Sequence, residues 1–453
     1  MKSVKRSQRL LTFVLLVFIA CMVMLVLKIQ KEASFYMSHN SKKSLGYVYD
    51  RNGDVLFDGT GEYSKYAKGH FTDVGNIIGD STNMMSNTLV MRNLDRLNNY
   101  SFTTGLVTDG GKAALYTTLD HVANRKVYDA FGNRNGCAVA YDYVTGEILI
   151  CVSKPSIDIT KGYANIDDFE SGTLMCKNMW GTVPGSTQKI STTAAGFETV
   201  GNVLYNKEFS CTGSYRNASG ELINCHKKGG HGKQNLQKAF ENSCNPYFAQ
   251  LIEDGSVPLE KIIEAYTKMG YSVNGAEKTY ISIDGITCEK ASTVLTNPFE
   301  FQTQWGCIGQ GDTLVSPVQL MLWQSAIVNG TGKMTLPHLI DKVTDVSGKT
   351  VYRAETSYGD EVFTSYAANE ICKVMLENGK NNYSKSIGGY EIGLKSGTAQ
   401  TKINGKDAEN SLLTGFITDR RHPIAFCVVI EDKNGGNVKS ETVVKVMLDA
   451  LCS

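Results

Sequence analysis

The sequence predicts an α/β (α+β) fold in which an antiparallel sheet is flanked by helices, beside an all-helical part and after a single N-terminal transmembrane helix. Three observations lead to this prediction: an uncharged apolar run near the start, apolar residues at helical spacing through the middle, and β-branched runs separated by turn residues near the end. Helices in the middle and strands at the end favour a mainly antiparallel sheet. With 453 residues, the chain can bury one large core and a smaller module.

The first element is an uncharged apolar run from Leu10 to Leu27. It has about the ~18 residues that are needed to span the hydrocarbon of a bilayer. A cleaved signal peptide is the alternative, but the run is longer than a usual signal core and no small-residue cleavage site follows it. We therefore expect residues 10–27 to be a membrane anchor of a cell membrane protein. Four basic residues precede the run: Lys2, Lys5, Arg6 and Arg9. By the positive-inside rule, we expect residues 1–9 in the cytoplasm and the chain after the run outside.

Residues 28–110 are polar and rich in glycine and asparagine. Within them, GYVYDRNGDVLFDG alternates apolar and polar residues around the turn signal at 51–54, which predicts a β-hairpin. The rest of this stretch lacks sustained periodicity. We expect a small membrane-proximal module there, followed by the main domain at 111–453.

The main domain shows its elements in order. A strand and a helix are expected in LYTTLDHVANRKVYDAF, and two strands joined at 144–146 in CAVAYDYVTGEILICV. A buried helix is expected from about Ser186. Two helices are expected in NLQKAFENSCNPYFAQLIED, with a break at 244–245, because Pro246 disfavours the helical conformation in the residue before it. Three strands and an amphipathic helix should end the chain: YEIGLKSGTAQT, LLTGFITD, PIAFCVVIED and SETVVKVMLDALCS.

Charge and cysteine content restrict the function further. The 46 basic and 45 acidic residues leave a net charge of +1, so we expect no nucleic-acid binding. Most of the twelve cysteines lie in apolar stretches and are interpreted as small buried residues. Cys211 and Cys225 differ, because they flank a polar loop followed by His226 and His231. A disulfide or a zinc site could form there, but the usual spacing of zinc ligands is missing. We therefore expect no metal and leave their redox state open.

Ser186 and Lys189 form a Ser-x-x-Lys tetrad at the start of a predicted helix. Residues three apart share a helix face, so the amine can take the proton of the hydroxyl and create a nucleophile. Unpaired backbone N–H groups at a helix start can also stabilise an oxyanion. A helix cap followed by a solvated lysine is the ordinary explanation of such a tetrad. It is, however, the only Ser-x-x-Lys in the chain.

Two further motifs follow. Ser243-Cys244-Asn245 lies in the expected interhelical break, although Ser-x-Asn also begins at Ser38, Ser81 and Ser272 and a polar turn would explain it. Lys395-Ser396-Gly397-Thr398 follows a β-rich run, where a residue without a side chain lets a peptide-like substrate lie against an edge strand. Each motif is weak alone. The order Ser-x-x-Lys, Ser-x-Asn, Lys-Ser-Gly is the combined signature of penicillin-interacting serine enzymes.

From about residue 115 to the end, the chain resembles the class B penicillin-binding proteins, which carry a transpeptidase domain with the serine β-lactamase and penicillin-binding fold. The segment between anchor and domain is shorter than the pedestal of the larger members. The resemblance extends to the connecting segments TTLD, YDYVTGEILICVSKPSID, GHGKQNLQKAFENSCNPYF, IGQGDTLVSPVQL and KSGTAQ, and to DRNGDVL after the anchor.

This resemblance implies a role for each motif residue. Ser186 would be the acylated nucleophile and Lys189 the neutral base that activates it, which requires a lowered lysine pKa. Ser243 would relay the proton to the leaving D-alanine, and Asn245 would hold Lys189 and the substrate amide. Lys395 would maintain a positive field. In the Lys-Ser-Gly-Thr run, Ser396 keeps the hydroxyl where many relatives carry threonine, Gly397 would leave room for substrate, and Thr398 would bind the substrate carboxylate.

The implied reaction is a D,D-transpeptidation that cross-links peptidoglycan stem peptides through an acyl-enzyme on Ser186, without cofactor or metal. β-Lactams would mimic the D-alanyl-D-alanine donor and inhibit the enzyme. A membrane-embedded glycan polymerase would be the partner. A D,D-carboxypeptidase or β-lactamase using the same residues is an alternative within the enzymes, and a non-catalytic β-lactam sensor or division scaffold is an alternative outside them. The acceptor amine, the oligomeric state and a role in elongation, division or sporulation stay open.

Overall fold

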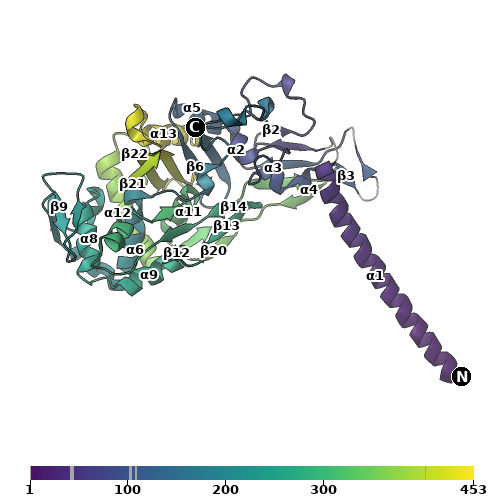
Figure 1. Ribbon diagram of the computed structural model, residues 1–453, viewed down its shortest axis with the longest axis horizontal. Helices are drawn as coiled ribbons and strands as arrows, with labels where there is room; N and C mark the ends of the chain where they lie inside the picture. Colours follow the sequence, from purple (N-terminus) through teal and green to yellow (C-terminus); the bar gives the residue numbers. More distant parts are fainter. Residues whose placement is uncertain (1, 41–44, 102–104, 108–109, 404) are drawn as a thin grey trace.

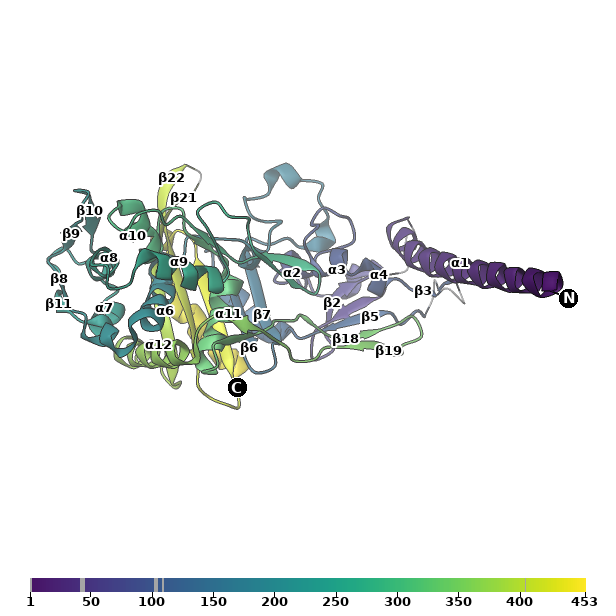
Figure 2. The same ribbon diagram turned by 90° about the horizontal axis from the view of Figure 1, so that it is seen from below.

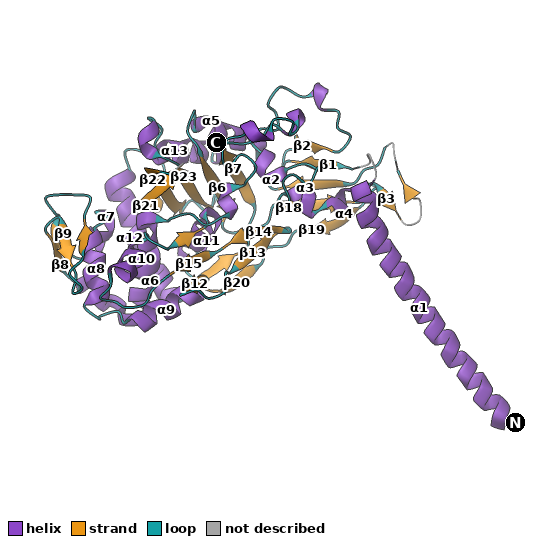
Figure 3. Ribbon diagram, in the orientation of Figure 1, coloured by secondary structure: helices purple, strands orange, loops and turns teal. Residues whose placement is uncertain are grey.

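The computed structural model describes residues 2–40, 45–101, 105–107, 110–403 and 405–453. A long N-terminal helix, α1 (Lys2–Asn40), projects from a body that contains two five-stranded sheets and a helical region (Figure 1). Helices and strands are mixed through the body, as the sequence predicted (Figure 3). Within α1, the 26-residue segment Val4–Ile29 is long and apolar enough to cross a membrane and contains the predicted anchor at 10–27.

The first sheet lies next to the attachment of α1 (Figure 2). The predicted hairpin is confirmed, because β1 and β2 pair antiparallel around the turn at 51–54. β1 also pairs parallel with β5, which in turn pairs antiparallel with β18. This sheet therefore contains strands from both sides of the boundary at residue 110, which remains a sequence prediction. In spatial order the strands are β19 (Thr350–Arg353), β18 (Ile340–Thr344), β5 (Ala114–Thr117), β1 (Tyr47–Tyr49) and β2 (Val55–Asp58).

The central sheet is antiparallel throughout, which confirms the sequence prediction. Its order places the two strands that follow α5 (His121–Ala130) beside the three strands near the end of the chain. The strand that carries the Lys-Ser-Gly run, β21, lies at one edge. In spatial order the strands are β21 (Ile392–Ile403), β22 (Lys406–Ile417), β23 (Ile424–Ile430), β6 (Gly136–Asp142) and β7 (Ile148–Lys154).

Helices cover both faces of the central sheet. Along β23, Phe426 and Val428 pack into the core with α5 (His121–Ala130) and α13 (Ser440–Leu451), while the alternate residues Cys427 and Val429 belong to the core on the opposite face. This alternation is the period of two that an extended strand imposes. On the second face, α11 (Pro317–Val328) is buried on all sides, and α12 (Ser365–Asn378) packs beside β21.

The helical region lies beyond α11, at the end of the molecule opposite α1 (Figure 2). It begins with the short 3₁₀ turn η5 (Gly185–Gln188), which continues directly into α6, so the predicted helix near Ser186 is present. The predicted break between two helices is present, but it lies at residues 242–244, between α7 (Leu236–Glu241) and α8 (Asn245–Glu253), so Asn245 already begins the second helix. The helices of this region are α6 (Lys189–Val200), α7 (Leu236–Glu241), α8 (Asn245–Glu253), α9 (Leu259–Lys268) and α10 (Phe301–Ile308).

Short elements complete the described chain. Three small helices precede β5: α2 (Gly75–Ile78), α3 (Leu89–Arg92) and α4 (Leu94–Leu97). The remaining strands form two- or three-stranded ribbons: β3 (Tyr100–Ser101) with β4 (Gly105–Leu106), β8 (Phe209–Cys211) with β11 (Gly232–Gln234), β9 (Ser214–Arg216) with β10 (Leu222–Asn224), β12 (Tyr271–Val273) with β15 (Ala291–Thr293) and β16 (Leu314–Val315), β13 (Tyr280–Ile283) with β14 (Ile286–Glu289), and β17 (Lys333–Thr335) with β20 (Tyr358–Glu361).

Candidate active site

The three sequence motifs lie far apart in the chain but meet at one place. Ser186 is in η5, Ser243 and Asn245 are at the break between α7 and α8, and Lys395 is in the edge strand β21. Hydrogen bonds from Lys189, the first residue of α6, and from Lys395 join all three segments. The competing Ser-x-Asn sequences do not contribute to this site in the described part of the chain.

Two glycines allow η5 and β21 to approach closely. A Cβ atom on Gly397 would lie 2.6 Å from the carbonyl oxygen of Pro184, and one on Gly185 would lie 2.5 Å from the carbonyl oxygen of Thr398. Gly185 also has a φ of +53°, a conformation that side chains disfavour. The resemblance implies that Gly397 leaves room for substrate. The structure adds a second physical reason, because the missing side chain lets the strand pack against the serine turn.

The amine of Lys189 is the centre of the hydrogen-bond network. Its Nζ lies 2.8 Å from Ser186 Oγ, 2.8 Å from Asn245 Oδ1 and 2.9 Å from the carbonyl oxygen of Ser243. The ring of Phe248 closes one side, with its centroid 5.4 Å from Nζ. Lys189 is fully buried, at 0% exposure. Desolvation by this burial lowers its pKa to about 7.

Lys395 is buried beside it and shares a partner. Its Nζ donates to Ser243 Oγ over 3.1 Å and to the carbonyl oxygen of Ser396 over 2.9 Å. Burial lowers its pKa well below the ordinary lysine value, and the nearby amine of Lys189 adds to the effect. Ser243 Oγ thus lies between two lysine amines, at 3.3 Å from Nζ of Lys189.

The backbone at Ser243 is unusual. Its φ of +50° places a residue other than glycine in the left-handed region. Such a conformation costs free energy and persists where the surroundings hold it. The flanking amides are fixed to α7, since Ser243 N–H donates to Phe240 O over 3.2 Å and Cys244 N–H donates to Ala239 O over 2.9 Å.

Two side chains that sequence reasoning missed support the edge strand. Tyr383 donates its hydroxyl to Ser396 Oγ over 2.6 Å. Gln310 donates to the carbonyl oxygen of Thr398 over 3.1 Å and accepts from the backbone N–H of Gln400 over 3.3 Å. Gln310 lies in the IGQGD segment that the resemblance singled out, so its position was signalled although its contact was not. Tyr383 carried no such signal.

An open cleft of about 600 Å³ runs over these groups. Ser186 is half-buried and Thr398 is exposed at its floor, so an extended ligand can reach both. The stacked rings of Phe301 and Trp305 form part of one wall, with centroids 5.1 Å apart. The cleft is lined by Ser186, Leu222, Asn224, Cys225, His226, Ser243, Asn245, Phe301, Trp305, Gln310, Ser396, Thr398, Gln400 and Glu409.

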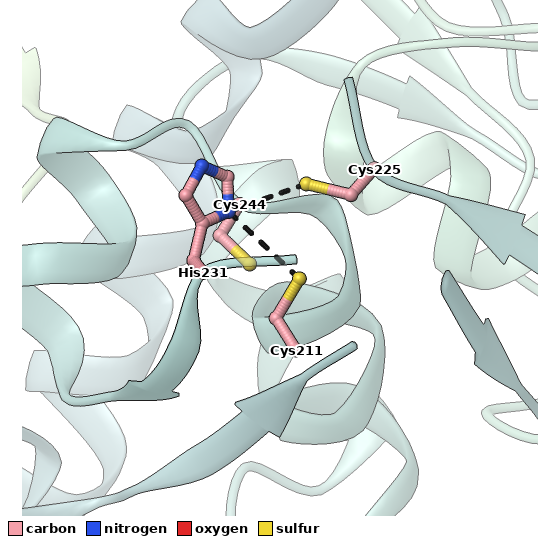
Figure 4. Close-up of side chains that lie close together, drawn as sticks. All are labelled: Cys211, Cys225, His231 and Cys244. Atoms are coloured by element: carbon pink, nitrogen blue, oxygen red, sulfur yellow. Dashed lines mark hydrogen bonds between the residues drawn. The ribbon is translucent and has the colours of Figure 1, made fainter. Parts of the chain in front are cut away.

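The cysteines divide as the sequence suggested. Those in apolar stretches are buried: Cys137, Cys151, Cys307 and Cys427. Cys211 and Cys225 are free thiols and both lie beside His231 (Figure 4). The structure adds Cys244 to this group, a residue that the sequence analysis treated only as the middle of the Ser-x-Asn motif.

The sequence model of one protein family, the penicillin binding protein transpeptidase domain, matches residues 136–449 of the chain. This range contains all three motifs. The chain belongs to this family. Among curated relatives, this transpeptidase-family chain is 30% identical to stage V sporulation protein D of Bacillus subtilis, over 69% of the chain and 48% of the relative. It is 25% identical to peptidoglycan D,D-transpeptidase MrdA of Acinetobacter baumannii, over 71% of the chain and 52% of the relative. The chain therefore spans about half the length of these relatives.

Solved structures show the same fold. The penicillin G acyl-enzyme complex of penicillin-binding protein A from Mycobacterium tuberculosis superimposes with a TM-score of 0.74 at 17% identity, covering 91% of this chain and 100% of that chain. The predicted resemblance to the class B penicillin-binding proteins and to their fold is thus confirmed.

Proposed function

We propose that the chain is a peptidoglycan D,D-transpeptidase that forms an acyl-enzyme on Ser186. The observation that carries this proposal is the fully buried Lys189 amine, 2.8 Å from Ser186 Oγ and with a pKa of about 7. A base with a pKa near the working pH is most effective in general base catalysis. The names of the relatives support the reaction class, since one is a peptidoglycan D,D-transpeptidase.

The contacts of Lys189 match those of a neutral amine. A neutral amine has two N–H donors and one lone pair. The carbonyl oxygen of Ser243 and the Oδ1 atom of Asn245 can take the two donors, at 2.9 and 2.8 Å. The lone pair is then directed to the Ser186 hydroxyl, which donates its proton as Oγ attacks the substrate carbonyl.

The other motif residues complete the acid–base path. Ser243 Oγ lies within hydrogen-bond distance of both lysine amines, so it can carry the proton from Lys189 to the leaving amine. Lys395 supplies a positive field when protonated. Asn245 holds Lys189 in place and can also contact the substrate amide. Each of these roles places a polar group where charge develops during acyl transfer.

The edge strand would bind the donor peptide. Thr398 is exposed in the cleft and can donate to the terminal carboxylate. Ser396, on the same strand as Thr398, is held by a hydrogen bond from Tyr383. An extended peptide can add to a free sheet edge through backbone hydrogen bonds. The backbone N–H groups of Ser186 and Thr398 would form the oxyanion hole.

The proposed reaction has two balanced steps. Ser186 Oγ attacks the carbonyl carbon of the penultimate D-alanine, the C–N bond breaks, and the terminal D-alanine leaves with the proton that Ser186 lost. An amine of a second stem peptide then attacks the ester, forms the new amide, and returns its proton to Ser186 through Lys189. A β-lactam acylates Ser186 in the same way, but its opened ring stays attached and blocks the second step.

We also propose the cellular arrangement. Residues 10–27 would anchor the protein in the cell membrane, with residues 1–9 in the cytoplasm and the catalytic domain of 111–453 outside, beyond a membrane-proximal module at 28–110. A membrane-embedded glycan polymerase would supply nascent strands at the same surface.

The test uses the full chain in detergent with a fluorescent penicillin. We expect one adduct on Ser186 that persists for hours, measured by intact mass and peptide mapping. Ser186→Ala should abolish labelling without changing the thermal unfolding temperature, while the matched change Ser347→Ala, in an exposed turn, should leave labelling unchanged. Labelling of Ser186→Ala at the wild-type level would refute the assignment. Rapid loss of the adduct with release of hydrolysed drug would instead indicate a β-lactamase.

A further inference from the structure

Beside the cleft, four metal-ligating side chains converge on one point (Figure 4). The Sγ atoms of Cys211, Cys225 and Cys244 and a ring nitrogen of His231 all lie within 4.8 Å of one another. The Nδ1 atom of His231 lies 3.3 Å from Cys225 Sγ and 3.8 Å from Cys211 Sγ. The three thiols are buried, at 2%, 7% and 0% exposure for Cys211, Cys225 and Cys244.

The four ligands come from four separate stretches of backbone. Cys211 ends β8, Cys225 directly follows β10, His231 directly precedes β11, and Cys244 caps the N-terminus of α8. The fold therefore gathers three thiols and one ring nitrogen beside the polar cleft. Cys225 itself lines that cleft.

The spacing fits a tetrahedral metal. Zn–S bonds of ~2.3 Å and Zn–N bonds of ~2.0 Å at tetrahedral angles place two sulfurs ~3.8 Å apart and a sulfur and a nitrogen ~3.5 Å apart. The two Sγ–Nδ1 distances of 3.3 and 3.8 Å lie on either side of the second value. Four ligands with no position left for water are typical of a structural zinc site.

We propose that Cys211, Cys225, His231 and Cys244 bind one Zn²⁺ ion. Each thiol releases its proton on binding, and the neutral histidine ring binds through Nδ1. Three thiolates and one imidazole form one of the common structural sets for zinc. The sequence predicts no metal because the usual pairs of closely spaced ligands are absent. Of the four candidate side chains in its polar loop, the structure gathers Cys211, Cys225 and His231, and Cys244 takes the place of His226.

The bound metal would also position Ser243 and Asn245, the two motif residues on either side of Cys244. This role rests on the proposed function. Cys244 lies between Ser243 and Asn245, so a metal bound to its sulfur fixes the peptide that carries both. It would hold Ser243 at its φ of +50°. Asn245 is tied to the same cluster a second time, since its Nδ2 donates to the carbonyl oxygen of Asn224 over 3.0 Å, one residue before Cys225. Cys244 is thus a positioning residue.

The first experiment measures metal directly on the full chain, purified in detergent without added zinc. We expect about one zinc ion per chain, measured by inductively coupled plasma mass spectrometry. Cobalt substitution should give the visible absorption of a tetrahedral thiolate site. Cys211→Ser should weaken binding by more than the roughly 10- to 100-fold that loss of an outer partner costs. Cys372→Ser, at a half-buried cysteine outside the cluster, should leave the metal content unchanged.

The second experiment connects the metal to acylation. Removing zinc with a chelator should slow labelling by fluorescent penicillin about 10-fold or more, and adding zinc back should restore it. Ser186→Ala should keep zinc while losing labelling, so failure of the proposed function and failure of the zinc site give different results.

Two outcomes would overturn the inference. Wild-type protein without bound zinc, and unable to take up zinc or cobalt, would exclude the site even if labelling stays normal. A thiol titration under denaturing conditions that shows a disulfide among Cys211, Cys225 and Cys244 would replace the metal site with a cross-link. If the protein binds zinc but is labelled at the same rate before and after the zinc is removed, the site stands and only its positioning role is refuted.

Discussion

At the residue scale, two buried lysine side chains share the hydroxyl of one serine. Lys189 and Lys395 have exposures of 0% and 1%, and both lie within 3.3 Å of Ser243 Oγ. Two ammonium groups this close would repel each other strongly in a medium of low dielectric constant. The site therefore disfavours the state in which both amines are protonated, and the 2.8 Å contact with Ser186 Oγ makes Lys189 the amine that is placed to act as the base.

The pH dependence of acylation follows from this state. Because burial lowers the Lys189 pKa to about 7, the amine is protonated and unable to accept a proton below that pH. We expect the acylation rate constant for fluorescent penicillin to rise between about pH 6 and about pH 8, with its midpoint near 7. Lys189→Met should lower the rate by at least about 100-fold and remove this rise. A wild-type rate that is independent of pH over that range would contradict the neutral-base role.

At the element scale, the hairpin β1–β2 is joined to α5 through a buried histidine. The protonated ring of His121 donates from Nδ1 to Asp54 Oδ2, in the hairpin, over 2.6 Å and from Nε2 to Asp73 Oδ1 over 3.3 Å. Arg125, one turn along α5, pairs with the same Asp73 over 2.5 Å. The ring of His70 packs edge-on against that of His121, with centroids 4.8 Å apart. The hairpin is therefore coupled by charge to α5, and its strand β1 also pairs with β5.

This contact predicts a pH-dependent stability. Burial by itself lowers the pKa of His121, but the carboxylates of Asp73 and Asp54 outweigh it and raise the pKa from 6.5 to about 9. Since the folded pKa is higher than the unfolded one, the stabilisation is complete below about pH 6.5 and is lost as the pH rises through about 9. We expect the thermal unfolding temperature of the wild type to fall over this window, and that of His121→Asn to fall less. His422→Asn, in the loop before β23, is the control and should behave like the wild type. Equal slopes for His121→Asn and wild type would show that His121 does not carry the effect.

At the scale of the whole molecule, α1 projects from one end, and elements that line the candidate active site, α8, α10 and β21, lie toward the other (Figure 2). The first sheet is attached near α1, and the helical region with the cleft lies beyond the central sheet. If α1 spans a bilayer through its segment Val4–Ile29, this arrangement holds the cleft away from the membrane surface. Such a distance would suit the peptidoglycan substrate of the proposed reaction.

The orientation can be measured on cells with tags at both ends of the chain. We expect protease added to spheroplasts to remove the C-terminal tag and to leave the N-terminal tag intact, because basic residues before the apolar segment favour a cytoplasmic N-terminus. Extraction with alkaline carbonate should leave the protein in the membrane fraction. Protection of the C-terminal tag, or release of the chain by carbonate, would contradict the proposed topology.

The sequence by itself determined the order of elements, the apolar N-terminal segment, the antiparallel strands at the end and the three motifs. These features are local, since the period of apolar residues and the positions of proline and glycine set helices, strands and breaks. Only the tertiary structure decided which Ser-x-Asn meets Lys189, why Gly397 has no side chain, and that Tyr383 and Gln310 support the edge strand. It alone gathered Cys211, Cys225, His231 and Cys244 and joined strands from both sides of residue 110 into one sheet. Such contacts join residues distant in the chain, and a single sequence carries no measure of the distance between them.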